Sequence, residues 1–115
     1  MPVTSSGTDV KNAFVNAAAG GTDGAFITAV PGRRIRVLAA VLSGSGTATS
    51  VTFNSKPAGA GVAISAAFTC GVNDMVSLPF NDSGWFATVA GEGLTTTTGA
   101  GTTVGIHISY IEDYA

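Results

Sequence analysis

Side chains that carry chemistry are scarce in this sequence. The chain of 115 residues has one histidine (His107) and one cysteine (Cys70), and only 10% of its residues are charged. Acid–base, nucleophilic and metal-dependent catalysis all require titratable or coordinating side chains, and enzyme sites combine several of them. We therefore expect no catalytic site, no metal site and no cofactor. The composition instead predicts a protein that acts through its shape and its surfaces.

The sequence also argues against disulfides and membrane spans. One cysteine cannot form an intramolecular disulfide, and one cysteine with one histidine cannot build a structural zinc site. Cys70 is expected to be a small, half-buried side chain and not a reactive thiol. The longest strongly apolar block, Val37 to Leu42, is far too short to cross a bilayer, and no basic stretch followed by an apolar run opens the chain. We expect a soluble protein without a classical signal peptide or a membrane partner.

The shortage of charge has two interpretations. Ordinary soluble domains carry about 25% charged residues, whereas this chain carries 10% and a formal net charge of −2. The surface could be neutral and rich in hydroxyl groups. Alternatively, neighbouring subunits could cover much of it, because charged residues are depleted in the cores of interfaces. We favour the second interpretation, since so small a net charge gives little repulsion between free molecules. It predicts a homo-oligomer.

Three of the five basic residues lie together, at Arg33, Arg34 and Arg36. Binding to nucleic acid requires a broader basic field than this, so no nucleic-acid partner is expected. The three arginines either form the solvated start of a strand or donate hydrogen bonds to the carboxylates and carbonyls of a partner. The second role suits the planar fork of the guanidinium group. We retain the arginines as candidate interface residues.

Short alternating runs of Gly, Ala, Thr, Ser and Val are typical of strands and tight turns. Residues 1–10 are small and polar and are expected to form a flexible N-terminal arm, with residues 11–115 as one domain. The segment 11–19 is ambiguous, because its apolar residues fit one face of a helix ending at Gly20 as well as the alternation of a strand. We favour the strand, because the glycine-rich residues 20–24 then form a loop into a second strand at 25–30.

Pro31 and Gly32 fit the two central positions of a type II turn, in which the second residue takes a positive φ. The turn leads into a long strand at residues 33–42. Strict alternation places four apolar residues of this strand on one face: Ile35, Val37, Ala39 and Val41.

Six further strands are expected at residues 49–54, 61–68, 75–80, 85–89, 94–98 and 103–111. In the last of them, Val104, Ile106, Ile108 and Tyr110 point to one side, and His107, on the other, is either a satisfied sheet residue or an interface group. Regular short strands without a convincing helix predict an all-β fold, either a sandwich or a barrel. The fold class we expect is a single jelly-roll-like antiparallel β-sandwich of about eight strands.

Trp85 and Phe86 are the most distinctive aromatic pair. Neighbouring residues of a strand face opposite sides, so one ring can enter the core while the other meets a partner or stacks on a sugar. We favour core plus interface and retain both residues as interface candidates. Asp82 and Glu92 flank Trp85 and could form the carboxylate pair of a glycosidase. Both lie in turn sequences, where acidic side chains bind their own backbone, so we do not expect catalysis.

Three segments together carry a resemblance: Phe14 to Leu38, Gly84 to Leu94 and Val104 to Tyr110. Their pattern of turns and strands resembles a group of small virion proteins of tailed bacteriophages, over nearly the whole chain beyond the N-terminal arm. The resemblance implies a single jelly-roll-like domain, commonly trimeric, that serves as a capsid decoration or cement protein or as a module of a fibre or tail. It supplies no active-site residues.

The function expected from this resemblance is mechanical. A trimer would bind the outer surface of the capsid and stabilise contacts between major capsid subunits, its three contacts acting multivalently. The protein would be made in the cytoplasm of the host bacterium and end on the virion. The alternative is a module of a fibre or tail that recognises a receptor or a carbohydrate.

Overall fold

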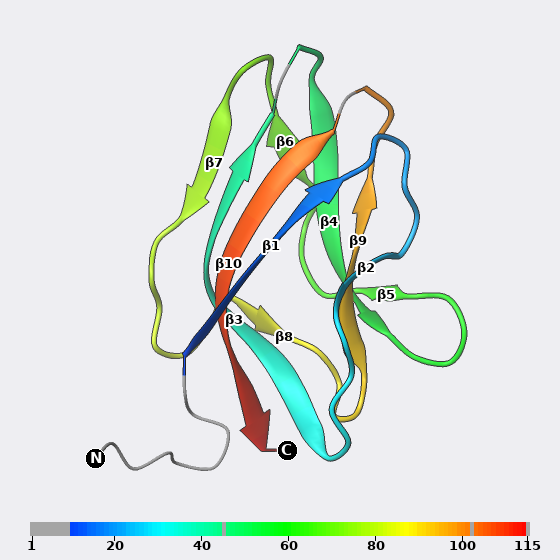
Figure 1. The fold of residues 1–115 in the computed structure, drawn as a ribbon, viewed down its shortest axis with the longest axis vertical. Coiled ribbons are helices and arrows are strands. Elements are labelled where there is room, and N and C mark those ends of the chain that lie inside the picture. Colours follow the sequence, from blue (N-terminus) through cyan, green and yellow to red (C-terminus); the bar gives the residue numbers. More distant parts are fainter. Residues whose placement is uncertain (1–9, 45, 102, 115) are drawn as a thin grey trace.

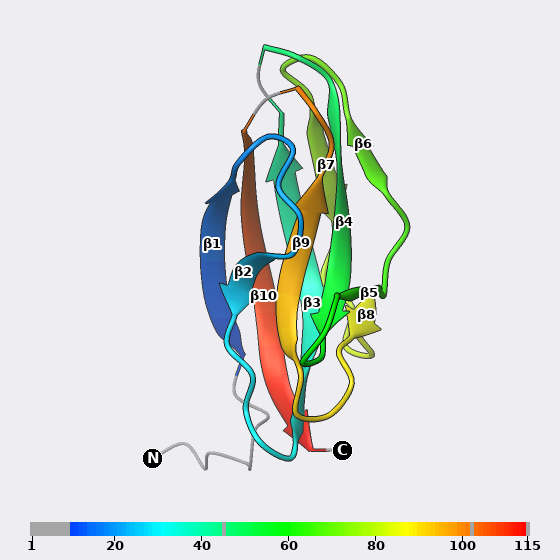
Figure 2. The ribbon, with the colours of Figure 1, turned by 90° about the vertical axis from the view of Figure 1, so that its right-hand side faces the viewer.

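Two antiparallel sheets packed face to face make up the fold (Figures 1 and 2). The computed structural model describes residues 10–44, 46–101 and 103–114. Within these ranges the regular structure consists entirely of β-strands. No helix capable of crossing a membrane is found among the described residues. The expected all-β sandwich is thus confirmed, with ten strands, of which two are only two residues long. The expected N-terminal arm lies outside the described residues except for Val10.

Sheet A has the strand order β1-β10-β3-β7, and β8 also pairs with β3. Sheet B has the order β2-β9-β4-β5, and β6 also pairs with β4. The strands of sheet A are β1 (Lys11–Ala17), β3 (Arg33–Ser43), β7 (Met75–Leu78), β8 (Phe86–Ala87) and β10 (Val104–Tyr114). Those of sheet B are β2 (Gly24–Ile27), β4 (Thr49–Lys56), β5 (Val62–Ala63), β6 (Phe68–Cys70) and β9 (Gly93–Thr98).

The chain crosses repeatedly from one sheet to the other. It runs from β1 in sheet A to β2 in sheet B, returns to β3, crosses again to β4, and ends with β9 in sheet B and β10 in sheet A. Strands that are distant in sequence therefore become neighbours, most clearly β1 and β10 at the two ends of the described chain (Figure 1). The two-sheet sandwich is established by this arrangement, and its finer classification as a jelly roll stays a prediction.

The ambiguous segment at residues 11–19 is a strand, as expected. Ala17 is buried, and Ala13 and Val15 pack against the core, so alternate residues face inward. Phe14 points the other way and is 70% exposed. A helix would have placed Phe14 on the apolar face with Ala17, whereas the strand separates them.

The predicted turn at Pro31 and Gly32 is also confirmed. The backbone nitrogen of Arg33 donates a hydrogen bond to the carbonyl oxygen of Val30 at 3.1 Å, which closes a four-residue turn. Gly32 has a φ of +75°, the left-handed conformation that the second central position of a type II turn requires.

The predicted faces of β3 are wrong beyond Val37. Ile35 and Val37 are in the core, but the next core residues are Ala40 and Leu42 instead of Ala39 and Val41. The cause is a bulge against β10: Tyr110 pairs with Val37 and the preceding Ser109 pairs with Ala39, so Leu38 is an extra residue. One extra residue exchanges the inward and outward positions of the rest of the strand.

The strand expected at residues 61–68 is interrupted. Only β5 and β6 at its ends pair with β4, and between them the side chain of Ser65 replaces a backbone partner. Its hydroxyl oxygen accepts a hydrogen bond from the backbone nitrogen of Phe53 at 2.9 Å. A side chain that binds the backbone in this way competes with the strand ladder.

The core lies between the two sheets and centres on the fully buried Phe53, whose ring contacts those of Phe68 and Phe86. Cys70 is also in this core and is completely buried, so the expectation of a half-buried thiol is wrong. The reason is its position at the end of β6 opposite Thr49 of β4, where the side chain turns into the sandwich.

Candidate interaction surface

The two groups of candidate interface residues lie side by side. They are about fifty residues apart in sequence, but β8 pairs with the first half of β3, so Ala87 lies opposite Arg36 and Phe86 opposite Val37. The arginine cluster and the aromatic pair therefore belong to one surface at one end of sheet A. We call this region the arginine–tryptophan surface and define it as residues 33–36 and 79–89 with Asp113.

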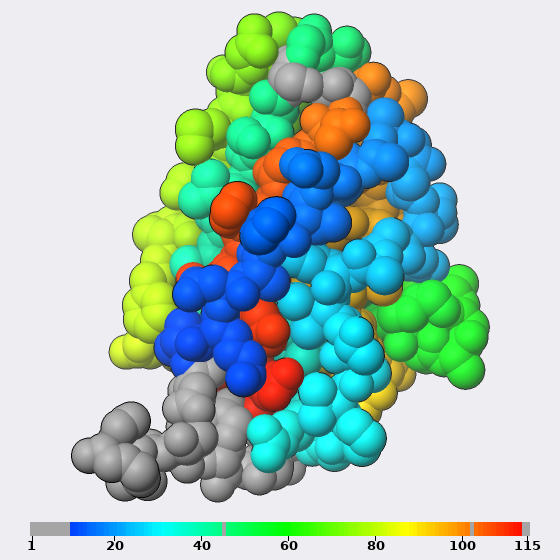
Figure 3. Space-filling model, in the orientation of Figure 1, coloured from blue at the N-terminus to red at the C-terminus, as the bar shows by residue number. Residues whose placement is uncertain are grey.

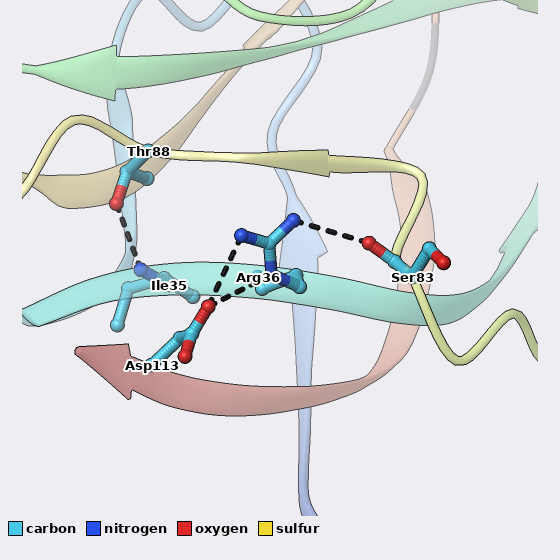
Figure 4. Close-up of polar contacts among 5 residues, drawn as sticks. All are labelled: Ile35, Arg36, Ser83, Thr88 and Asp113. Carbon is cyan, nitrogen blue, oxygen red and sulfur yellow. Dashed lines mark hydrogen bonds and ion pairs between the residues drawn. The ribbon is translucent and has the colours of Figure 1, made fainter. Parts of the chain in front are cut away.

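Arg36 is bound by its own chain at two points (Figure 4). Its Nε and Nη2 atoms lie 3.1 Å and 3.0 Å from Oδ2 of Asp113, and its Nη1 donates to the carbonyl oxygen of Ser83 at 3.1 Å. The side chains of Arg36 and Asp113 are only 27% and 30% exposed. The carboxylate that we expected from a partner is thus supplied to Arg36 by Asp113, and contact with a partner stays a prediction.

Gly84 allows the loop between β7 and β8 to close over Arg36. Its φ is +83°, and a Cβ atom built there would lie 2.5 Å from Cγ of Arg36. Only glycine satisfies both the left-handed backbone and the close approach. The loop is therefore packed directly on the stem of the arginine, and this contact helps to hold its guanidinium group in place.

Thr88 extends the attachment of this segment to β3 (Figure 4). Its Oγ1 accepts a hydrogen bond from the backbone nitrogen of Ile35 at 2.8 Å, and its own backbone nitrogen donates to the carbonyl oxygen of Ile35 at 2.9 Å. Further along, the nitrogen of Gly91 donates to the carbonyl oxygen of Arg33 at 2.7 Å. These bonds keep residues 86–91 along the start of β3.

Trp85 and Phe86 divide between surface and core, as predicted. The ring of Phe86 lies 4.9 Å from that of Phe53 in the core. Trp85 is 43% exposed, and its indole Nε1 donates a hydrogen bond to the carbonyl oxygen of Pro79 at 2.7 Å. Its backbone nitrogen donates to Val37 at 2.8 Å. The indole is therefore held in one orientation with much of its ring accessible. Phe80, which follows Pro79 in sequence, is 59% exposed.

Arg33 and Arg34 are half-buried at the start of β3. The Nε atom of Arg34 is buried and has no hydrogen-bond partner within the part of the chain that the structure describes. A buried donor without a partner is unfavourable by about 1–3 kcal/mol. These two arginines remain interface candidates, with Arg34 carrying an unsatisfied donor.

The two members of the possible carboxylate pair have different surroundings. Oε1 of Glu92 accepts a hydrogen bond from Oγ of Ser55 at 2.6 Å, and the same Ser55 oxygen accepts one from the backbone nitrogen of Val89 at 2.9 Å. Glu92 thus connects its turn to β4, whereas Asp82 is exposed in the loop before Trp85. Among the residues with described positions, no three His, Cys, Asp or Glu side chains gather closely enough to hold a metal ion.

Sequence reasoning missed two features. Asp113 was not recognised as the partner of Arg36, although an acidic residue near the end of the last predicted strand is a signal for a cross-strand ion pair with the basic start of another strand. The second is the stacked pair of Phe14 and His107, whose ring centroids are 5.3 Å apart. The sequence offered one indication of this pair: if residues 11–19 form a strand, Phe14 points away from the side of Val15 and Ala17.

No protein-family model matches the chain, and the search of the curated proteins finds no match. The assignment of a function therefore rests on the geometry of the surface.

Proposed function

We propose that the chain is a non-enzymatic structural protein of a bacteriophage virion. In the specific form that we favour, it is a capsid decoration protein that binds the outer shell as a trimer and stabilises contacts between major capsid subunits. The observation that carries the proposal is the arginine–tryptophan surface, where an accessible indole is held in one orientation beside half-buried arginines.

Such a surface has the properties of a binding site for another protein. Tryptophan and arginine are the residues most often found to dominate binding energy at protein interfaces. Because the indole of Trp85 is bound to Pro79, and the guanidinium group of Arg36 to Asp113 and Ser83, little side-chain entropy is lost when a partner docks. A modest contact of this kind suits a protein that is repeated many times on a lattice, since a trimer engages through three copies of it.

The topology is in keeping with the proposed class of protein. Sheet A and sheet B each contain a path of four strands, and the chain crosses from one sheet to the other several times, which supports a jelly roll. We include the jelly-roll classification in the proposal. The sandwich alone does not determine the function, because one fold hosts many unrelated functions.

One observation favours the alternative, a carbohydrate- or receptor-recognising module of a fibre or tail. Trp85 presents an aromatic ring with its Nε1 already satisfied by Pro79, so the exposed part of the ring is free for stacking. A sugar-binding role needs polar groups beside the ring for the hydroxyls, and exposed Asn81 and Asp82 are close in sequence.

The copy number in purified virions separates the two functions. Quantitative mass spectrometry should find the protein at a simple ratio to the major capsid protein, because a decoration protein occupies every equivalent lattice position. A few copies per particle would instead identify a fibre or tail module, and absence from virions would overturn both.

A variant pair then tests the surface. Trp85→Ala should reduce cosedimentation of the protein with expanded empty shells, and Val62→Ala should not. Val62 is a suitable control because it is 61% exposed but lies on β5 of sheet B. Equal binding of Trp85→Ala and wild type, with both folded by circular dichroism, would exclude this surface as the contact with the shell.

A further inference from the structure

Strand β1 is an uncovered edge of sheet A. It pairs with β10 over its whole length, and it stands first in the order β1-β10-β3-β7, so its other side has no strand partner among the described residues. Figure 2 shows β1 at one margin of the molecule, and its blue atoms lie on the surface in Figure 3. The backbone NH and carbonyl groups on this side are therefore open to pairing with another strand.

Length and regularity distinguish this edge from the others. β1 has seven residues, whereas the other outer strands, β2, β5, β6, β7 and β8, have two to four. β1 contains no proline and no register shift against β10, and its one charged residue, Lys11, lies at its start. Short strands, bulges, prolines and charges are the features that keep sheet edges from pairing with other chains. Because β1 largely lacks them, we expect its edge to pair.

The side chains of β1 alternate between water and core. Asn12, Phe14 and Asn16 are exposed, and Phe14 most clearly so at 70%. Ala13 and Val15, between them, pack against the core. Residues two apart in a strand point to the same side. The three exposed side chains therefore form one row along the outer face of sheet A, directly beside the free edge.

This row is symmetric about Phe14, and the symmetry identifies the partner as a second copy of β1. If two such strands pair antiparallel around a twofold axis at Phe14, the two phenyl rings face each other and each Asn12 faces Asn16 of the other copy. Side-chain amides both donate and accept hydrogen bonds, so the asparagines match. Lys11 faces Ala17 of the other copy, so no like charges meet. A strand of unrelated sequence would not supply this match.

We propose that two copies of this chain pair through the free edges of β1, with Phe14 at the twofold axis. The two copies of sheet A then form one continuous antiparallel sheet. Within each copy the ring of Phe14 stacks on that of His107 with 5.3 Å between centroids, and the two stacks meet at the junction. Facing aromatic residues on neighbouring strands stabilise a sheet.

The contact goes beyond the proposed function and does not rest on it. Both subunits use the same surface, so the contact produces an even number of chains. On its own it gives a dimer. Where the trimer of the proposed function also forms, the contact joins two trimers. It uses none of the residues of the arginine–tryptophan surface.

Sedimentation equilibrium of the full chain at micromolar concentration tests the contact. The wild type should sediment at twice or six times the 11.3 kDa chain mass. Phe14→Lys should weaken the association on the order of tenfold, because the ring pair is lost and two like charges face each other. Val62→Lys is the matched control: Val62 is 61% exposed but lies on β5 of sheet B, so its replacement should leave the mass unchanged.

Two charge variants test the register. Asn12→Lys combined with Asn16→Lys places like charges opposite each other, and so does Asn12→Glu combined with Asn16→Glu. Each double variant alone should associate less than the wild type. An equimolar mixture of the two should recover the association, because opposite charges then face each other at both positions. A mixture that associates no more than the separate variants would overturn the inference.

Thermal melts by circular dichroism establish that each variant is folded, and the charge variants decide if Phe14→Lys does not fold. A wild-type monomer or trimer, or an even-numbered assembly indifferent to Phe14→Lys, would also overturn the inference. A trimer that binds shells would at the same time leave the proposed function standing. A dimer or hexamer that depends on Phe14 but does not bind shells would refute the proposed function and leave the contact standing.

Discussion

Oδ2 of Asp23 accepts a hydrogen bond from the backbone nitrogen of Gly61, 38 residues further along the chain, at 2.9 Å. The other carboxylate oxygen, Oδ1, accepts hydrogen bonds from Nδ2 of Asn54 and Oγ1 of Thr95, both at 3.3 Å. One side chain thus joins the loop before β2 to the loop before β5 and to strands β4 and β9. Asp23 has a φ of +51°, an unfavourable conformation for which these bonds compensate.

Replacement of Asp23 by alanine should lower the free energy of unfolding by about 1.5–3 kcal/mol, the contribution of hydrogen bonds to a charged group. Urea denaturation at pH 7 measures the change. Asp82→Ala is the control, because Asp82 is exposed in the loop after β7 and its loss should alter stability by less than about 0.5 kcal/mol. Equal stabilities of the two variants would show that the carboxylate of Asp23 does not hold the loops together.

Gly61 and Gly59 should respond differently to alanine. A Cβ atom at Gly61 would lie 2.1 Å from Oδ1 of Asp23, whereas a Cβ atom at Gly59 meets nothing within 4 Å. Gly61→Ala should therefore destabilise the protein by about 1–3 kcal/mol through overpacking. Gly59→Ala should be neutral or slightly stabilising. Thermal unfolding of both variants makes the comparison, and a Gly61→Ala protein that melts with the wild type would contradict the close approach.

The ion pair of Arg36 and Asp113 should show measurable coupling. Both side chains are less than one-third exposed, and two nitrogen atoms of Arg36 contact Oδ2 of Asp113. A double-mutant cycle with Arg36→Ser and Asp113→Ser should therefore give a coupling energy of about 0.5–1 kcal/mol. The coupling should decrease between low salt and 1 M salt because screening weakens it. Additive effects of the two substitutions at low salt would mean that the pair makes no contribution of its own.

Stability should fall at alkaline pH because of Cys70. Burial raises the pKa of the thiol above its ordinary value of 9.0, and the negative charge of Asp74 raises it further. The folded state then holds its proton more tightly than the unfolded state, so the stabilisation is complete below pH 9.0 and is lost as the pH rises through the raised pKa. Burial also raises the pKa of Tyr110, with the same sign at a higher pH.

Urea titrations of the wild type and Cys70→Ala between pH 7 and about pH 10 check this dependence. The alanine variant should lose less stability than the wild type just above pH 9.0, because only the unfolded wild type releases a thiol proton there. Parallel pH profiles would show that the thiol has the same pKa in both states. The intact protein should also react slowly with thiol reagents, since Cys70 is completely buried.

The limits of sequence reasoning are clearest in β3 and β10. The alternation of Val104, Ile106, Ile108 and Tyr110 correctly identified the buried side of the last strand. The same reasoning failed in β3 after Val37, because the bulge at Leu38 arises from how the two strands fit together. Alternation describes a single strand, whereas a bulge is a property of a pair of strands.

In the arginine–tryptophan surface, too, local features could be predicted from the sequence and contacts between distant residues could not. The basic cluster, the aromatic pair and the turn glycines were visible in the sequence, because they are local features. The contacts of Arg36 with Asp113, 77 residues away, and with Ser83, 47 residues away, were not visible in the sequence. Nor was the stacking of Phe14 on His107.

The sequence by itself therefore determined most of the strands, the turn at Pro31 and Gly32, and the division of Trp85 and Phe86 between surface and core. Each of these depends on the conformational preferences or the alternation of residues next to one another in the chain. Only the tertiary structure decided which strands pair and which residues become neighbours. Those outcomes depend on how whole strands bury their apolar faces against each other, and many registers satisfy the local pattern equally well.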